Sequence, residues 1–177
     1  MNSFAVVEQF EQSVAKFAGS KHAVAVNTCT NAIFLSVRYV TTQIVHRGGP
    51  VVIPARTFIS VPMAIIHAGQ KVEFDPEPWR GTYQLKPFPI IDSALRFSRG
   101  MYDGGLHCLS FHARKLLNIG EGGMILTDDG PAAEWLRKAR YSGRDVKNGY
   151  RIEDIEMLRT ETSAWSDFSN EKQRGVD

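Results

Sequence analysis

Apolar positions along this chain follow two alternating patterns. Near the N-terminus they recur at three- and four-residue steps and stop at Gly19, which predicts an amphipathic helix that ends at a glycine. The next apolar run, HAVAV at 22–26, is short and continuous, as in a buried strand. The two patterns then alternate through the first half of the chain. The sequence therefore predicts an α/β domain.

The other elements are predicted from the same patterns. Helices are expected from Thr30 to about Val40, over 59–69 and over 131–143. Short apolar runs predict strands at 50–54, 71–74, 89–92, 107–110 and 123–127. This order is typical of a mostly parallel sheet flanked by helices, in which ligands bind at the carboxyl ends of the strands.

Composition and charge narrow the classes of partner. A chain of 177 residues, 43% of them hydrophobic, is long enough for one domain with a real core, which excludes disorder as the default. Lys and Arg number 21 and Asp and Glu 19, and the net charge of +2 is too small and too scattered for a nucleic-acid surface. We expect a small-molecule partner and no nucleic acid.

Cysteine usage and apolar runs bear on localisation. Cys29 and Cys108 lack the dense spacing of a disulfide scaffold and fit a reducing compartment. No apolar run is long enough to span a bilayer, and the opening MNSFAVVEQFEQ carries acidic residues where a signal peptide has a basic stretch. We expect a soluble, cytoplasmic protein with no membrane partner.

Polar residues that could carry chemistry follow the predicted strands. The turn at 28–30 joins the first strand to a helix start, where backbone N–H groups and hydroxyls suit a phosphate. Asp92 and Ser110 end two other strands, and Lys115 lies in the turn beyond Ser110. Each residue alone has a simpler explanation, because Thr28 or Thr30 can cap the helix, Asp92 can cap the next segment and a lone lysine is usually solvated.

A metal site is the weakest of the chemical alternatives. His107, Cys108 and His112 are close in sequence, but neighbouring residues of a strand point to opposite faces and no fourth ligand has suitable spacing. We therefore expect no metal.

Taken together, several blocks resemble the DegT-type sugar aminotransferases, a family of fold-type I pyridoxal-phosphate (PLP) enzymes. The lysine block is the most specific, because Ser, Phe, His, Lys and the Glu-Gly-Gly entry into the next strand all have the family's spacing. The resemblance covers the chain to about Asp145 and implies the large domain of this fold. The similar blocks, in the family's order, are FEQSVAKFAGSKHAVAVNTCTNAIFLSV, VVIPARTFISVPMAIIHAGQKVEFD, IIDSA, LSFHARKLLNIGEGGMILTDD and ARYSGRD.

The resemblance implies two catalytic residues. Lys115 would form the Schiff base with the PLP aldehyde and, once displaced by substrate, move a proton between the substrate carbon and the cofactor. Asp92 would pair with the pyridine nitrogen and keep it protonated, which makes the ring an electron sink.

The resemblance also implies a set of cofactor-binding residues. Ser110, Thr30 and the backbone around Cys29, with Thr28 in the same turn, would hold the phosphate. Phe58 would lie against the ring face, where family members carry an aromatic residue. Ordinary core packing is an almost equally good explanation of Phe58.

Three departures from the family pattern affect these expectations. The turn at 28–30 reads Thr-Cys-Thr and lacks the family's glycine, which predicts weaker phosphate binding. Leu95 stands where the family commonly has Gln or His near the cofactor's phenolic oxygen. A short linker at 80–88, RGTYQLKPF, replaces another helix and strand.

These observations lead to one expected function and one alternative. We expect a PLP-binding large domain, shortened, over 1–150 and a polar tail at 151–177 that begins an absent or truncated C-terminal domain. The expected activity is transfer of an amino group, from an amino-acid donor such as glutamate, to a nucleotide-linked keto sugar, in a homodimer that shares its active sites. The alternative is a non-catalytic remnant or PLP-binding module of the same fold.

Overall fold

The computed structural model of the chain describes residues 5–43, 49–141 and 143. The chain divides into two compact units, 1–136 and 137–177, and all the strands belong to the first. The expected boundary at 150 and the tail at 151–177 lie outside the described residues and stay predictions. The elements are α1 (Ala5–Ala18), β1 (His22–Val26), α2 (Cys29–Gln43), β2 (Val51–Pro54), α3 (Ser60–His67), β3 (Val72–Asp75), β4 (Tyr83–Gln84), β5 (Ile90–Asp92), β6 (Leu106–Ser110), β7 (Gly123–Thr127) and α4 (Gly130–Ala139).

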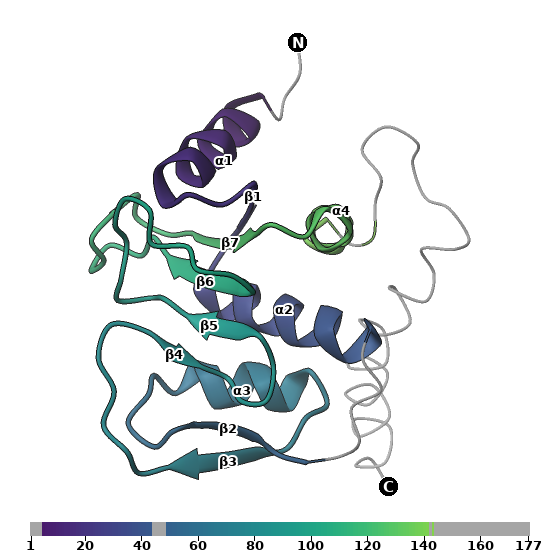
Figure 1. Cartoon of the computed structure of the whole chain (residues 1–177), viewed down its shortest axis with the longest axis vertical. Helices are drawn as coiled ribbons and strands as arrows, with labels where there is room; N and C mark the ends of the chain where they lie inside the picture. The colour runs from purple at the N-terminus through teal and green to yellow at the C-terminus, as the bar shows by residue number, and fades with distance from the viewer. Residues whose placement is uncertain (1–4, 44–48, 142, 144–177) are drawn as a thin grey trace, which may run out of the picture. The chain divides into compact units, whose positions relative to one another are not determined.

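The strands form a five-stranded sheet in the order β1-β7-β6-β5-β4 and a two-stranded sheet of β2 and β3. Two backbone hydrogen bonds join the sheets, from Val52 N–H to the Lys86 carbonyl (2.8 Å) and from Lys86 N–H to the Val52 carbonyl (3.1 Å). Figure 1 shows β2 and β3 continuing the series of strands beyond β4. The linker at 80–88 thus supplies the chain that lies between β5 and β2.

The α/β class is confirmed, but the pairing is mixed rather than mostly parallel. β5 pairs with β6, and β2 with β3, in parallel, whereas β1–β7, β6–β7 and β4–β5 are antiparallel. The reason at β6–β7 is the connection, because the loop at 111–122 turns straight back. Phe111 N–H donates to the Gly122 carbonyl and Ala113 N–H to the Gly120 carbonyl, both at 2.9 Å. A direct return of the chain gives antiparallel neighbours.

The two faces of the five-stranded sheet pack against different helices. On one face Leu109, Met124 and Leu126 form an apolar cluster with α1, whose buried side includes Val14. On the other face α2 packs against β5, β6 and β7, and its Ser36 hydroxyl contacts the Cys108 thiol at 3.5 Å. Because successive side chains of a strand alternate between faces, each strand contributes to both layers.

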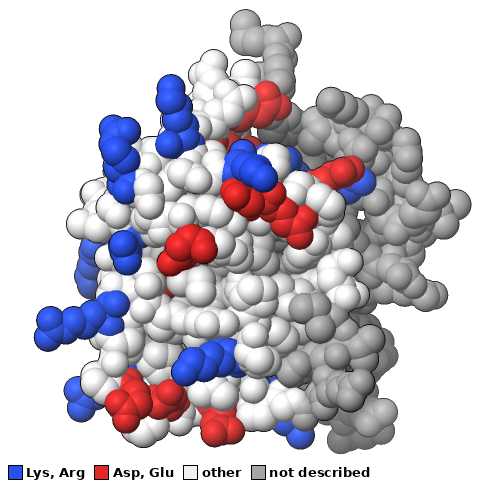
Figure 2. Space-filling model, in the orientation of Figure 1, with Lys and Arg blue, Asp and Glu red and all other residues white. Residues whose placement is uncertain are grey.

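On the face drawn in Figure 2, many Lys and Arg side chains follow the left edge, Asp and Glu lie mainly toward the top and the bottom, and the middle is mostly uncharged. None of the described helices has the length and apolar character needed to cross a membrane.

Candidate active site

Two residues predicted from the sequence meet at one edge of the sheet. β5 and β6 are parallel with Asp92 opposite Cys108, so Ser110 lies two residues further along the neighbouring strand. Side chains two residues apart share a face, and Cys108 faces α2. Asp92 and Ser110 therefore both lie at the carboxyl ends of their strands on the α2 face.

Asp92 is a buried carboxylate, 5% exposed. Its Oδ2 accepts a hydrogen bond from the Tyr83 hydroxyl (2.6 Å), and its Oδ1 accepts one from the Ala94 N–H (2.9 Å). Burial raises the pKa of Asp92 above its ordinary value, while the Tyr83 bond, the Ala94 bond and the charge of Lys115 act in the opposite direction. The two hydrogen bonds and the nearby cation favour the anion that burial disfavours.

Lys115 lies in the turn that follows β6 and is half-buried. Its backbone N–H donates to the His112 carbonyl at 2.8 Å. Its charge lowers the pKa of both Asp92 and Cys29, so the ammonium lies near both groups. Within the described residues it forms no ion pair with a carboxylate. Lys115 is thus a cation whose charge acts on Asp92 and Cys29.

The turn at 28–30 begins α2 beside the same edge. The Thr28 hydroxyl accepts a hydrogen bond from the Asn31 N–H (3.1 Å), so Thr28 caps the helix, as the simpler explanation predicted. The Cys29 thiol contacts the Cys108 carbonyl at 3.6 Å, which brings the helix start against β6 opposite Asp92. Burial, followed by the charge of Asp92, raises the pKa of the Cys29 thiol well above its ordinary value. Cys29 is therefore a neutral thiol in this position.

A close approach of two backbones occurs at this turn although the turn itself lacks glycine. A Cβ at Gly123 would lie 2.4 Å from the Thr28 carbonyl carbon and oxygen and 2.6 Å from the Cys29 nitrogen. The residue that permits the approach is thus on β7, directly opposite Ser110. The Gly-Gly entry into β7 has a steric reason here.

Three further residues singled out from the sequence form no hydrogen bond with Asp92 or Lys115 within the described part of the chain. The Thr30 hydroxyl donates to the Ser60 hydroxyl at 2.9 Å, which joins the first turns of α2 and α3. Phe58 is 74% exposed, so its ring is not core packing within the described residues. Leu95 is 55% exposed and supplies no polar group near Asp92.

Sequence reasoning missed Tyr83, Thr57 and Ser60. Tyr83 lies directly opposite Asp92 in the β4–β5 pair, and its hydroxyl also contacts the Thr57 hydroxyl. β4 has two residues, too short for any period to be detected. The one available signal was the tyrosine in the unusually short linker at 80–88.

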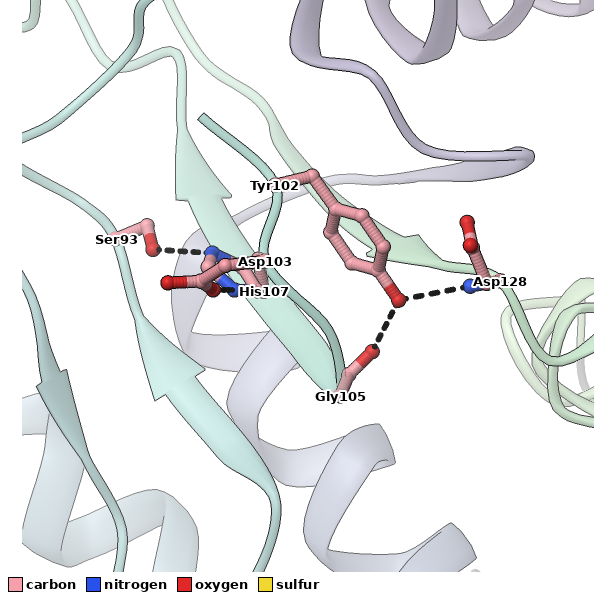
Figure 3. Close-up of polar contacts among 6 residues, drawn as sticks. All are labelled: Ser93, Tyr102, Asp103, Gly105, His107 and Asp128. Atoms are coloured by element: carbon pink, nitrogen blue, oxygen red, sulfur yellow. Dashed lines mark hydrogen bonds and ion pairs between the residues drawn. The ribbon is translucent and has the colours of Figure 1, made fainter. Parts of the chain in front are cut away.

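A second polar cluster lies on the opposite face of the same strands. The Ser93 hydroxyl contacts His107 Nδ1 at 3.1 Å, and His107 Nε2 contacts Asp103 Oδ1 at 2.7 Å (Figure 3). Ser93 is 1% exposed and His107 2%, so no substrate can reach the hydroxyl. Burial lowers the pKa of His107 despite its contact with Asp103. This cluster is structural.

Figure 3 also shows the hydrogen bonds of a neighbouring tyrosine, Tyr102. Tyr102 donates its hydroxyl proton to the Gly105 carbonyl (3.1 Å) and accepts a hydrogen bond from the Asp128 N–H (2.9 Å). These two hydrogen bonds connect the loop before β6 to the end of β7.

No group of three or more His, Cys, Asp or Glu side chains suited to a metal ion occurs among residues 5–43, 49–141 and 143.

Comparison with known proteins gives a family. The model of the DegT/DnrJ/EryC1/StrS aminotransferase family matches residues 2–89 and 100–157. The matched parts contain the turn at 28–30, Phe58, Ser110 and Lys115, whereas Asp92 falls between them. The family match therefore does not include Asp92, whose role stays a prediction.

Individual relatives agree with the family match. The chain is 28% identical over 77% of its length to the spore coat polysaccharide biosynthesis protein SpsC of Bacillus subtilis, and 26% identical over 81% to the GDP-perosamine synthase of Caulobacter vibrioides. It spans about half of each relative, 46% and 50%.

A solved structure shares the fold. The sugar aminotransferase CalS13 from Micromonospora echinospora superposes with a TM-score of 0.67 at 18% identity, over 98% of this chain and 67% of that one. The family match covers most of the sequence, and the sheet carries the expected lysine turn. The chain therefore belongs to the DegT/DnrJ/EryC1/StrS aminotransferase family, whose cofactor is pyridoxal 5′-phosphate.

Proposed function

We propose that this chain binds PLP covalently at Lys115 and acts in the transfer of an amino group from an amino acid, glutamate, to a keto group of a nucleotide-linked sugar. The observation that carries the proposal is that Ser110 and the buried Asp92 end two neighbouring parallel strands, with Lys115 in the turn that follows Ser110. A relative named GDP-perosamine synthase supports a nucleotide-linked sugar as the substrate class. The unpaired Cys29 and Cys108 fit the reducing conditions of a cytoplasm.

The residues at this edge match the three parts of the cofactor. An aldehyde needs an amine, which Lys115 has; a pyridinium needs a buried anion, which Asp92 has. A phosphate needs N–H donors and hydroxyls, and the first turn of α2 lies beside Ser110, whose hydroxyl has no partner among the described residues. Thr28, Cys29, Thr30 and Ser110 are the proposed phosphate residues.

Each protein group has a defined part in the reaction. PLP, when bound, supplies an electron sink for the pair left at the substrate carbon. The Asp92 carboxylate holds the proton on the ring nitrogen, and its burial excludes water that would weaken this interaction. Lys115 Nζ would take the proton from the substrate carbon and return it to the cofactor side. Phe58, exposed in this chain, would lie against one face of the ring.

The lysine assignment is tested by covalent trapping. Purified protein is mixed with PLP, reduced with borohydride and digested, and the modified peptide is mapped by mass spectrometry. We expect one reducible adduct at Lys115 and its loss in Lys115→Ala. Lys71→Ala, at an exposed lysine, is the matched control. An adduct spread over surface lysines would contradict the proposal.

A second candidate function is PLP binding without sugar transamination. The short connection at 80–88 and the apolar, exposed Leu95 favour it, because both remove parts that the resemblance leads us to expect near the cofactor. The candidates are separated by adding glutamate and then a keto sugar nucleotide to the protein with bound PLP. A change in the PLP spectrum at each addition supports transamination, and an unchanged spectrum supports binding alone.

We further propose that the chain acts as a homodimer. Phe58 and one face of α3, with Ile59, Met63 and Ile66 at helical spacing, are 48% to 74% exposed. A second copy of the chain is the proposed cover, since the resemblance implies active sites shared between two subunits. Sedimentation over a dilution series, with and without PLP, is the test. A monomer at every concentration with unchanged PLP affinity would exclude a shared site.

A further inference from the structure

The phenol of Tyr83 contacts the carboxylate assigned to the cofactor's ring nitrogen. Tyr83 and Asp92 are direct cross-strand partners in the antiparallel β4–β5 pair, so their side chains share a face. The hydroxyl donates to Asp92 Oδ2 at 2.6 Å, a short distance typical of a hydrogen bond to a charged acceptor. Both side chains are buried, with Tyr83 at 8% exposure.

The hydrogen bonds around this phenol run in one direction. A tyrosine hydroxyl has one proton, and here it is given to Asp92. The contact between the Tyr83 and Thr57 hydroxyls must then have Thr57 as donor. The chain Thr57 to Tyr83 to Asp92 therefore ends on the carboxylate, and each bond polarises the next.

The ring of Tyr83 is also held in place. Trp79 packs edge-on against it, with ring centroids 4.5 Å apart and an interplanar angle of 67°. The Trp79 indole N–H donates to the Arg56 carbonyl at 2.8 Å. Tyr83 and Trp79 both lie in or next to the short connection between β3 and β5. This connection therefore supplies both the hydroxyl that contacts Asp92 and the ring that packs against Tyr83.

We propose that Tyr83 is a positioning residue for Asp92, which it orients and keeps anionic so that the carboxylate is ready to receive the protonated ring nitrogen of PLP. The inference rests on the proposed function, in which Asp92 is that partner. The carboxylate keeps further acceptor capacity, because Tyr83 and the Ala94 N–H account for one hydrogen bond on each oxygen. The ring nitrogen can thus bind without displacing Tyr83.

The direct test follows the Asp92 carboxyl in the protein without cofactor. Tyr83→Phe keeps the ring and its packing on Trp79 and removes only the hydroxyl. Tyr102→Phe is the matched control, because it removes a hydroxyl with two hydrogen bonds that lies apart from Asp92. Carbon-13 NMR of the aspartate carboxyls, assigned with Asp92→Asn, is expected to show the Asp92 midpoint raised by about one pH unit in Tyr83→Phe. An unchanged midpoint overturns the proposal, and so does the same shift in Tyr102→Phe.

The second measurement is the affinity for PLP, read from absorbance at equilibrium. We expect Tyr83→Phe to bind PLP roughly tenfold more weakly than the parent, with Tyr102→Phe unchanged. A raised Asp92 midpoint with unchanged PLP affinity overturns the positioning role. If the parent itself fails to attach PLP at Lys115, the proposed function fails, while the titration still decides whether Tyr83 controls Asp92.

A third variant covers the case in which Tyr83→Phe does not fold. Thr57→Val keeps the shape of the side chain and removes the hydroxyl that donates to Tyr83. A smaller shift of the Asp92 midpoint in the same direction supports the hydrogen-bonded chain. No shift in Thr57→Val, with Tyr83→Phe unfolded, overturns it.

Discussion

Two polar clusters occupy opposite faces of the same pair of strands, β5 and β6. Asp92 faces α2 with Cys108, and the next residue, Ser93, faces the α1 side with His107. Each cluster contains an acidic residue and a hydroxyl; Asp92, Ser93 and His107 are buried, whereas Asp103 is exposed. Only the Asp92 cluster lies beside a helix start and a half-buried lysine. Adjacent positions of one strand therefore have unrelated roles.

The difference between the clusters is unused bonding capacity. His107 has a partner on each ring nitrogen, Ser93 on one side and Asp103 on the other, and the hydroxyl of Ser93 is sealed from solvent. At the Asp92 edge, Lys115 and Ser110 have no side-chain hydrogen bond or ion pair with the described residues, and Asp92 can accept more bonds. Buried polar groups alone do not indicate a binding site. Polar side chains that lack partners and lie beside oppositely charged groups do.

The largest effect is expected from removing the charge at Asp92. Asp92→Asn keeps the shape and loses the anion, so the single-turnover reaction of bound PLP with glutamate should slow by about 100-fold or more. Ser93→Ala, on the other face, should leave this rate nearly unchanged. Stopped-flow absorbance measures both. Equal rates in parent and Asp92→Asn would mean that Asp92 is only a cap at the end of a strand.

The next effect concerns the contact between β7 and the turn at 28–30. Gly123→Ala places a Cβ 2.4 Å from the Thr28 carbonyl, and backbone atoms cannot move aside as a flexible side chain can. We expect a loss of about 3 kcal/mol in the free energy of unfolding and weaker PLP binding. Gly49→Ala is the control, because a Cβ there meets nothing within 4 Å. Equal urea midpoints for both variants would refute the close approach.

A smaller effect is expected from breaking the cluster on the α1 side. Ser93→Ala leaves His107 Nδ1 buried without its partner, and His107→Leu does the same to the Ser93 hydroxyl, at about 2 kcal/mol each. The double variant should cost less than the sum, because neither polar group is then left unpaired. Urea unfolding gives the three values. Covalent PLP attachment at Lys115 should persist in all three variants. Its loss would mean that the cluster on the α1 side also contributes to cofactor binding.

The smallest effect is a pH dependence of stability from the same histidine. Burial lowers the folded-state pKa of His107 below its ordinary 6.5, with Arg96 acting in the same direction and Asp103 against it. The unfolded chain therefore binds a proton more readily, so this contribution is present above about pH 6.5 and is lost as the pH falls. The free energy of unfolding should decline more gently below pH 6.5 in His107→Gln than in the parent. The same substitution at the exposed His112 is the control, and an identical slope in His107→Gln would contradict the expectation.

The sequence allowed most of the elements to be placed, for a local reason. The apolar period that stops at Gly19, the period from Thr30 to about Val40 and the continuous run at 123–127 correspond to α1, α2 and β7. Each pattern reflects which side of its own segment is buried. β4 was missed since two residues carry no period. The antiparallel β6–β7 pair was missed because the lysine loop turns back without a helix, and the alternation rule assumes one.

The candidate site divides in the same way. A lysine lies five positions after a strand-ending serine, and an aspartate ends another strand. These residues and their order predicted the family by resemblance, and the family match confirms the family. The roles of Lys115 and Asp92 themselves stay predictions. Tyr83 could not be assigned, since its partnership with Asp92 depends on the register of a two-residue strand.

The sequence by itself determined the local elements, the family and the chemical groups, because these depend on periods and on residues close together along the chain. Only the tertiary structure decided that Gly123 provides the approach to Thr28, that Tyr83 donates to Asp92, and that Asp92 and Ser93 serve different faces. Those relations join segments up to about a hundred residues apart, and the pairing and packing of strands, rather than any local preference, bring such segments into contact.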